Sequence, residues 1–95
     1  MSKITKSAHN QDCTVNVFGV CNHDNSTTVF AHVNGGGGGM KHKDLFGCYA
    51  CFNCHKWLDG EYAKTDNRMM RDYYHLSAMM RTQQILLEKG LIEIK

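Results

Sequence analysis

Two pairs of cysteines carry the chemistry that this sequence suggests most directly. Cys51 and Cys54 lie in the segment CFNCHKWLDG, where a C-x2-C spacing lets one turn of chain aim both sulfurs at one metal ion. Cys13 and Cys21 form a second, wider pair. Four thiolates from two segments are the ligand set of a closed tetrahedral zinc site, which is the prediction for these four residues. The alternative is that Cys13 and Cys21 are ordinary buried thiols.

If four sulfurs saturate the zinc ion, a histidine and an aspartate of the same segment remain available for a different role. His55 and Asp59 are four residues apart, so a helix would place them on one face as half of a site for a second divalent cation. His32 lies near the end of TTVFAHV, which has the composition of a strand. This strand, a loop, a second strand and a helix bearing His55 outline a ββα-metal arrangement. A lone histidine such as His32 is more often structural or exposed.

These residues depend on a few short elements for their placement. Runs of β-forming residues predict strands over residues 13–21, 27–33 and 44–50. Residues 54–58 suit a short helix that stops at Gly60. The last five residues, LIEIK, are a possible final strand. Together these elements predict a small α+β domain.

A glycine run and a long helix complete the expected chain. Residues 35–39 are all glycine and predict a flexible connection, because the Gly-Lys-Ser/Thr of a phosphate-binding loop does not follow them. Roughly residues 66–89 predict an amphipathic helix that Asp66 could cap and that ends at Lys89 and the glycine after it. One apolar stripe of this helix is predicted to be core: Met69, Tyr73, Leu76, Met80 and Leu87.

Length, cysteine count and charge restrict the class of protein. A domain of 95 residues has a small core, so a metal, disulfides or a partner subunit is expected to add to its stability. Neither a signal-peptide h-region nor an apolar run that could span a bilayer is visible, so we expect a cytoplasmic protein with reduced thiols. Cys48, the fifth cysteine, is expected to be a small buried residue. The net charge of +2 is compatible with nucleic-acid binding but is no evidence for it.

Several segments together resemble a known family. DCTVNVFGVC, VFAHV, KHKDLF and ACFNCHKWLD follow one another in the order found in HNH endonucleases of the treble-clef type. With MMRTQQILLEKGLI, which metal spacing alone would not predict, the chain looks closest to the small YbcO-like family of phage and prophage proteins described as nucleases. This resemblance covers nearly the whole chain. It implies a zinc-stapled treble-clef core of the ββα-metal kind, followed by a long C-terminal amphipathic helix.

The resemblance also implies roles for individual residues. His32 matches the general base, and Asp44 falls where the family usually has an asparagine that orients this base. His55 matches a ligand of the catalytic metal, and Asp59 matches a second helical ligand seen in some members. Ala31 departs from the pattern, because many HNH enzymes carry a metal-binding Asp or His there. One HNH-like domain over residues 1–95 is expected, with an N-terminal arm over 1–12, the zinc and ββα core over 13–60 and the helix and tail over 61–95.

The implied function is metal-dependent endonucleolytic cleavage of DNA by a phage or prophage protein in the bacterial cytoplasm. The catalytic cation would be Mg²⁺, Mn²⁺ or a second Zn²⁺, and Lys41, Lys43 and Lys56 would contact phosphates. The competing function is a non-catalytic zinc module that binds nucleic acid or a protein, which Ala31 and the low net charge favour. A thiol–disulfide enzyme would leave the second cysteine pair unexplained. A homo-oligomer remains open. Three further histidines are expected to be exposed or structural: His9, His23 and His75.

Overall fold

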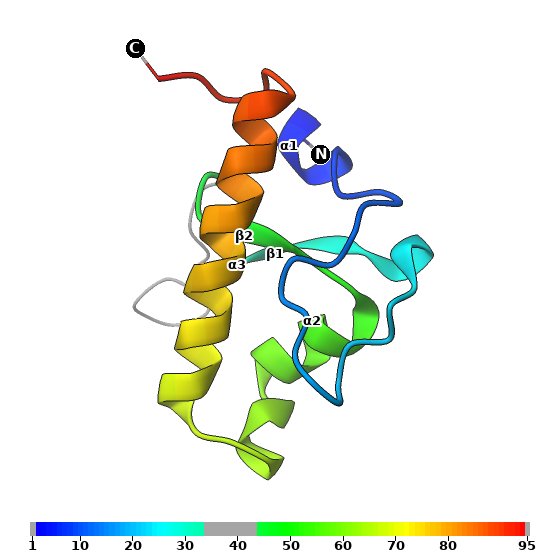
Figure 1. Cartoon of the computed structure of the whole chain (residues 1–95), viewed down its shortest axis with the longest axis vertical. Coiled ribbons are helices and arrows are strands. Elements are labelled where there is room, and N and C mark those ends of the chain that lie inside the picture. The colour runs from blue at the N-terminus through cyan, green and yellow to red at the C-terminus, as the bar shows by residue number, and fades with distance from the viewer. Residues whose placement is uncertain (1, 34–43, 95) are drawn as a thin grey trace.

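A two-stranded sheet and one long helix organise the molecule (Figure 1). The computed structural model describes residues 2–33 and 44–94, so the glycine run and two of the predicted phosphate contacts, Lys41 and Lys43, lie outside the described residues. The described elements are α1 (Lys3–Lys6), the 3-10 helix η1 (Asn25–Thr27), β1 (Val29–His32), β2 (Gly47–Ala50), α2 (Phe52–Asp59), the 3-10 helix η2 (Glu61–Lys64) and α3 (Arg68–Glu88). Helix α3 packs against β2 and runs the length of the molecule.

The two strands form an antiparallel hairpin in the segments predicted to be extended. Ala31 lies opposite Cys48, and His32 lies opposite Gly47. A side chain at position 47 would collide with the ring of Phe30, so only glycine lets that ring lie across the strand pair. All four residues of β2 are buried, because α3 covers one face of the sheet and the N-terminal segment reaches β2 as well.

The strand predicted over residues 13–21 is wrong. This segment consists of turns, and its Thr14 N–H donates to the Tyr49 carbonyl of β2 over 2.8 Å. Val15 and Val17 are nevertheless buried in the core that surrounds the cysteines. The apolar residues of this segment are therefore buried by an irregular loop, which also buries Thr14 and forms no ladder of hydrogen bonds.

Helix α2 forms where the sequence predicts it, with two more residues at its start and one more at its end. Cys51 caps the helix, because its sulfur accepts a hydrogen bond from the Cys54 N–H over 3.4 Å. Gly60 ends the helix, as expected. The N-terminus of α2 is thereby fixed by one of the four clustered cysteines.

Helix α3 forms within the predicted segment, but it begins two residues later and ends one residue earlier than predicted, and its cap differs. Asn67, rather than Asp66, caps the N-terminus, and its side chain accepts from the Met70 N–H over 2.9 Å. The end signal is confirmed. Gly90 has a φ of +71°, and the next N–H donates back to the Leu86 carbonyl over 2.9 Å. The described residues 91–94 form no strand, so the final strand considered for LIEIK is also wrong.

The apolar stripe predicted as the core face of α3 is mostly exposed. Met69, Tyr73, Leu76 and Met80 are exposed by 77%, 62%, 52% and 64%, respectively. The fully buried residues of α3 are Ala78, Thr82 and Leu86. Small side chains let the helix backbone approach β2 closely, and the Thr82 hydroxyl accepts from the Tyr49 N–H over 3.2 Å. The large apolar residues of the predicted stripe therefore do not mark the packed face of α3. Two of the three fully buried residues on that face, Ala78 and Thr82, have small side chains.

Among the described residues, no helix is long and apolar enough to cross a membrane.

Candidate functional site

The four predicted cysteine ligands lie together. The sulfurs of Cys13, Cys21, Cys51 and Cys54 are all within 4.8 Å of one another. The sulfurs of Cys21 and Cys51 are 3.8 Å apart. Four sulfurs at the usual Zn–S distance of about 2.3 Å from a tetrahedral ion would be about 3.8 Å apart. These four side chains could therefore hold a metal ion such as zinc with little movement.

The thiols of this cluster ionise unequally. A hydrogen bond from the Cys54 thiol lowers the pKa of Cys13 to about 5, and the same bond raises the pKa of Cys54 far above its usual value. Burial raises the pKa of Cys21 to about 11. Four adjacent thiolates repel one another, so a divalent cation at their centre is what allows all of them to ionise.

Cys48 lies outside this cluster. It is fully buried in β2, and burial raises its pKa to about 12. A thiol that stays protonated and inaccessible is chemically inert, so Cys48 is a packing residue, as the sequence predicts.

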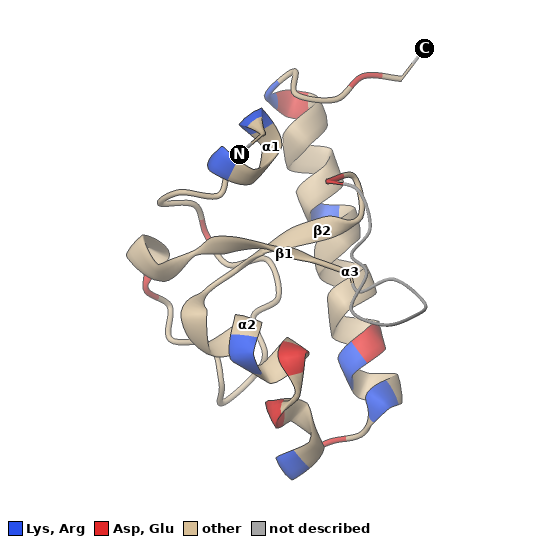
Figure 2. Cartoon of the chain, turned by 180° about the vertical axis from the view of Figure 1, so that it is seen from behind, with Lys and Arg blue, Asp and Glu red and all other residues tan. Residues whose placement is uncertain are grey.

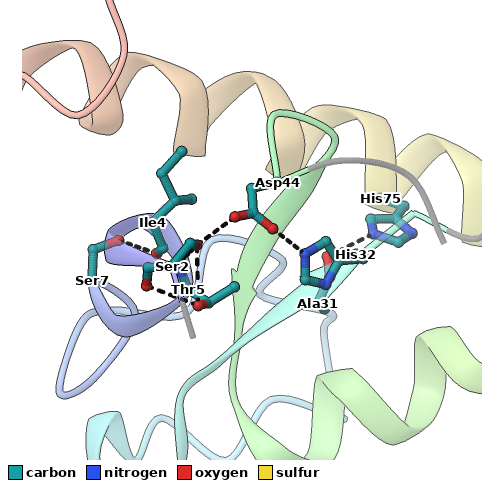
Figure 3. A network of polar contacts seen from close by, with 8 residues as sticks. All are labelled: Ser2, Ile4, Thr5, Ser7, Ala31, His32, Asp44 and His75. Atoms are coloured by element: carbon teal, nitrogen blue, oxygen red, sulfur yellow. Dashed lines mark hydrogen bonds and ion pairs between the residues drawn. The ribbon is translucent and has the colours of Figure 1, made fainter.

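The His32 side chain is held by the carboxylate of Asp44. The His32 Nε2 and Asp44 Oδ1 atoms are 2.7 Å apart, and the other carboxylate oxygen accepts from the Ser2 hydroxyl (Figure 3). The Ser2 hydroxyl and His32 together hold the pKa of Asp44 below its usual range, so this carboxyl carries no proton near neutral pH. In a neutral His32 ring, Nε2 is then the donor and the lone pair is on Nδ1.

A small cavity brings residues of three elements together beside His32. It measures about 90 Å³ and lies between the end of β1, the end of α2 and the first half of α3. The described side chains lining it include His32, Asp59 and His75. His55 is not among these lining residues, but its Nε2 atom lies 3.5 Å from the Asp59 Oδ2. The histidine of β1 and the His55–Asp59 pair of α2 thus approach the same region from two elements.

The His55–Asp59 pair has a spacing that could bind one cation. Two ligand atoms about 2.1 Å from a common ion are about 3.0–3.4 Å apart in octahedral or tetrahedral geometry, close to the 3.5 Å observed. Within residues 2–33 and 44–94, however, the four cysteines are the one group in which three or more ligand side chains gather tightly. A cation on His55 and Asp59 would therefore take its remaining ligands from water or a bound phosphate.

The cavity also contains two residues to which the sequence analysis gave no role, His75 and Arg71. His75 Nε2 lies 3.4 Å from the Ala31 carbonyl, and burial lowers its pKa (Figure 3). Arg71 donates to the Leu58 carbonyl over 3.1 Å, which ties α3 to the end of α2. Arg71 and His75 precede Ala78 by seven and three residues, so they share its helix face. This spacing would have revealed them, had the buried face been identified by its small residues.

The lysine of α2 lies outside the cavity. Lys56 forms an exposed ion pair with Glu61 at 3.7 Å, and its ammonium group lies 4.8 Å from the centre of the Phe52 ring. Its predicted contact with phosphate stays a prediction.

Comparison with known proteins identifies the family. The family model described as "Putative nuclease YbcO" matches residues 2–91 of this chain. The chain belongs to the YbcO family. The match includes every cysteine of the cluster and both sides of the His32 cavity, and it ends just beyond α3.

Two curated relatives support membership of the YbcO family over the full length. The "Putative nuclease YbcO" of Escherichia coli K-12 is 34% identical over 96 residues, which cover 98% of this chain and 99% of the relative. The "Putative nuclease ybcO" of Enterobacteria phage 82 shows the same identity and coverage. Both a bacterial and a phage genome thus encode proteins of this family.

A solved structure shows the same fold. It is described as "Structure of a putative bacteriophage protein from Escherichia coli str. K-12 substr. MG1655". It is 32% identical to this chain, with a TM-score of 0.78, and the match covers 92% of this chain and 99% of the other. The two-stranded sheet with a long C-terminal helix is therefore a fold already observed in a phage-related protein.

Proposed function

We propose that this protein is a metal-dependent DNA endonuclease of the HNH type that hydrolyses phosphodiester bonds. The observation that carries the proposal is the Asp44–His32 hydrogen bond beside a cavity that also receives Asp59 from α2. A histidine held by a carboxylate, with its second nitrogen unprotonated, is suited to general-base catalysis near neutral pH. The names of the family and of both relatives describe nucleases, which supports the same reaction class.

The order of elements supports assignment to the ββα-metal type. β1 ends at the proposed base, β2 follows, and α2 carries His55 and Asp59. We assign the cysteine cluster to a structural zinc ion of the treble-clef kind, since its two halves come from the loop before β1 and from the start of α2. The whole chain is proposed to act as one nuclease domain.

His32 is proposed to remove a proton from the attacking water. Asp44 keeps the imidazole in the tautomer whose Nδ1 accepts that proton, and it stabilises the positive charge that the ring gains. His55 and Asp59 would hold a divalent cation, which supplies Lewis-acid stabilisation of the charge that develops on the phosphate. His75 lines the same cavity and is uncharged near neutral pH, because burial lowers its pKa. A neutral imidazole adds no positive charge that would repel the cation beside the phosphate.

A plasmid-nicking assay with added Mg²⁺ or Mn²⁺ tests the proposal. The wild-type protein should cut. The rate of cutting by His32→Ala should be lower by a factor of about 10² or more, while the variant keeps its fold and bound metal. Asp44→Asn should also lose activity, because an amide no longer enforces the tautomer. Asp66→Asn, which makes the same change on an exposed loop, is the matched control and should cut like wild type. Full activity of His32→Ala would remove the base assignment.

A non-catalytic zinc module that binds nucleic acid is the second candidate. The absence of a third clustered ligand beside His55 and Asp59, within the described residues, favours it. Acidic residues also lie among the basic ones over α2, η2 and the start of α3 (Figure 2). This alternative predicts a gel shift with DNA but no nicking under any divalent cation.

A further inference from the structure

A second cavity lined by His32 has no role in the proposed hydrolysis. It measures about 680 Å³, within the range of small-molecule sites. Its walls come from α1, from the residues just after it and from β1, and they include Lys6, Thr28, Phe30 and His32. His32 therefore separates two hollows, one beside Asp59 and one beneath α1.

The remaining wall is apolar and aromatic. The Phe30 ring packs edge-to-face against His32 at 5.1 Å and against Tyr49 at 6.1 Å between ring centres, which fixes its orientation. Val29 beside it is 42% exposed. A fixed aromatic ring is a surface on which a planar heterocycle can pack.

Cationic and polar groups stand at the α1 side of the same cavity. Lys6 and His9 both line it, and both are exposed. A lysine ammonium group is suited to a phosphate oxygen, and a histidine can donate to one. The cavity thus combines an aromatic wall with phosphate-binding groups at its rim, which together match a nucleotide.

We propose that this cavity receives an unstacked nucleobase of the DNA strand whose neighbouring phosphate lies at His32. The inference rests on the proposed nuclease function. The base packs against Phe30, and Lys6 contacts the flanking phosphate. Because a base inside an intact duplex is not free to leave its stack without cost, the protein favours single-stranded or locally unpaired DNA.

Binding of labelled oligonucleotides, measured by fluorescence anisotropy with zinc-loaded protein and no added Mg²⁺ or Mn²⁺, tests this site. The probes are a single-stranded oligonucleotide and the same strand with abasic positions, which keeps every phosphate but removes bases. Stacking of one base is worth about 5- to 150-fold in affinity, so the intact strand should bind about tenfold tighter or more. A tenfold preference for intact over abasic DNA that disappears in Val29→Glu would support the site.

The matched control is Leu76→Glu, which makes the same change on the exposed face of α3 and should keep the preference. Equal affinity of the wild-type protein for intact and abasic strands would overturn the base site, even if the protein nicks plasmids. A base preference in a protein that never cuts would instead overturn the nuclease and leave the binding site standing. Loss of the preference in both Glu variants would also overturn the assignment to this cavity.

Discussion

Replacement of Cys51 by alanine is expected to unfold the domain. A folded domain of 95 residues is typically stable by about 5–14 kcal/mol, at roughly 0.05–0.15 kcal/mol per residue. Zinc bound to structural sites of this kind contributes about 10–16 kcal/mol. Loss of one of four thiolates therefore removes a free energy comparable with the whole stability. Cys51 also caps α2, which adds about 1 kcal/mol to the loss.

Cys48 provides a matched control. Cys48 and Cys51 are both fully buried, they lie three residues apart, and replacement by alanine removes one sulfur from each. Cys48 is not part of the cluster of four thiols. Cys48→Ala should therefore cost only the lost packing of one atom, about 1 kcal/mol, and should leave the protein folded.

Circular dichroism at the helical minimum and a chromogenic count of released zinc measure both effects. Wild type and Cys48→Ala should release one zinc ion per chain and lose helical signal with it, whereas Cys51→Ala should show neither bound zinc nor a folded spectrum. A Cys51→Ala protein that melts like wild type, or wild-type protein that keeps its helix after zinc is removed, would refute this reasoning.

Two further predictions concern α3. Leu86→Ala should lower the free energy of unfolding, measured in urea, by about 2–5 kcal/mol, because Leu86 is fully buried. Met80 is exposed, so Met80→Ala should change this free energy by less than about 0.5 kcal/mol. Equal losses in the two variants would contradict the observed packing. The pKa of His75 is lowered in the folded protein, so protons bind the unfolded chain more tightly and stability is lost as the pH falls below about 6.5. Between about pH 7.5 and pH 5.5, the melting temperature of wild type should thus fall more than that of His75→Gln. An identical fall in both proteins would contradict the burial of an uncharged His75.

The parts of the fold that local chemistry dictates were predictable. Ligand spacing brings Cys51 and Cys54 together within one turn, and the end of α3 needs little more than a glycine that accepts a positive φ. The hairpin follows from two runs of β-forming residues. Each of these signals acts over a few neighbouring residues, so tertiary contacts do not have to be known to interpret it.

Features set by tertiary packing were not predictable from side-chain type. Hydrophobicity alone places Met80 in the core of α3 and gives Thr82 no importance, but the reverse holds, because Thr82 sits where the helix touches β2. The alternation of residues 13–21 likewise fits a strand as well as an irregular loop that buries its apolar side chains. In both cases the surface against which the segment packs decides which side chains are buried, and a single sequence does not show that surface.

The same reasoning applies to the candidate site. The pattern of His32, His55 and Asp59 predicted that strand and helix would approach one region, and His32 and Asp59, but not His55, line one cavity. Their roles stay proposals. His75 was expected to be exposed or structural, because it has no ligand partner nearby in sequence and reaches the cavity only through the packing of α3.

The thiol cluster has a practical consequence for anyone who measures cleavage in the presence of a chelator. One half of the cluster precedes β1 and the other half begins α2, so removing its ion would release the two elements that carry His32 and Asp59 from each other. In that case EDTA would stop cleavage by disrupting the scaffold, without removing a catalytic cation. Inhibition by EDTA therefore counts as support for a catalytic cation only when the helical signal survives the treatment and Mg²⁺ or Mn²⁺ alone restores cutting.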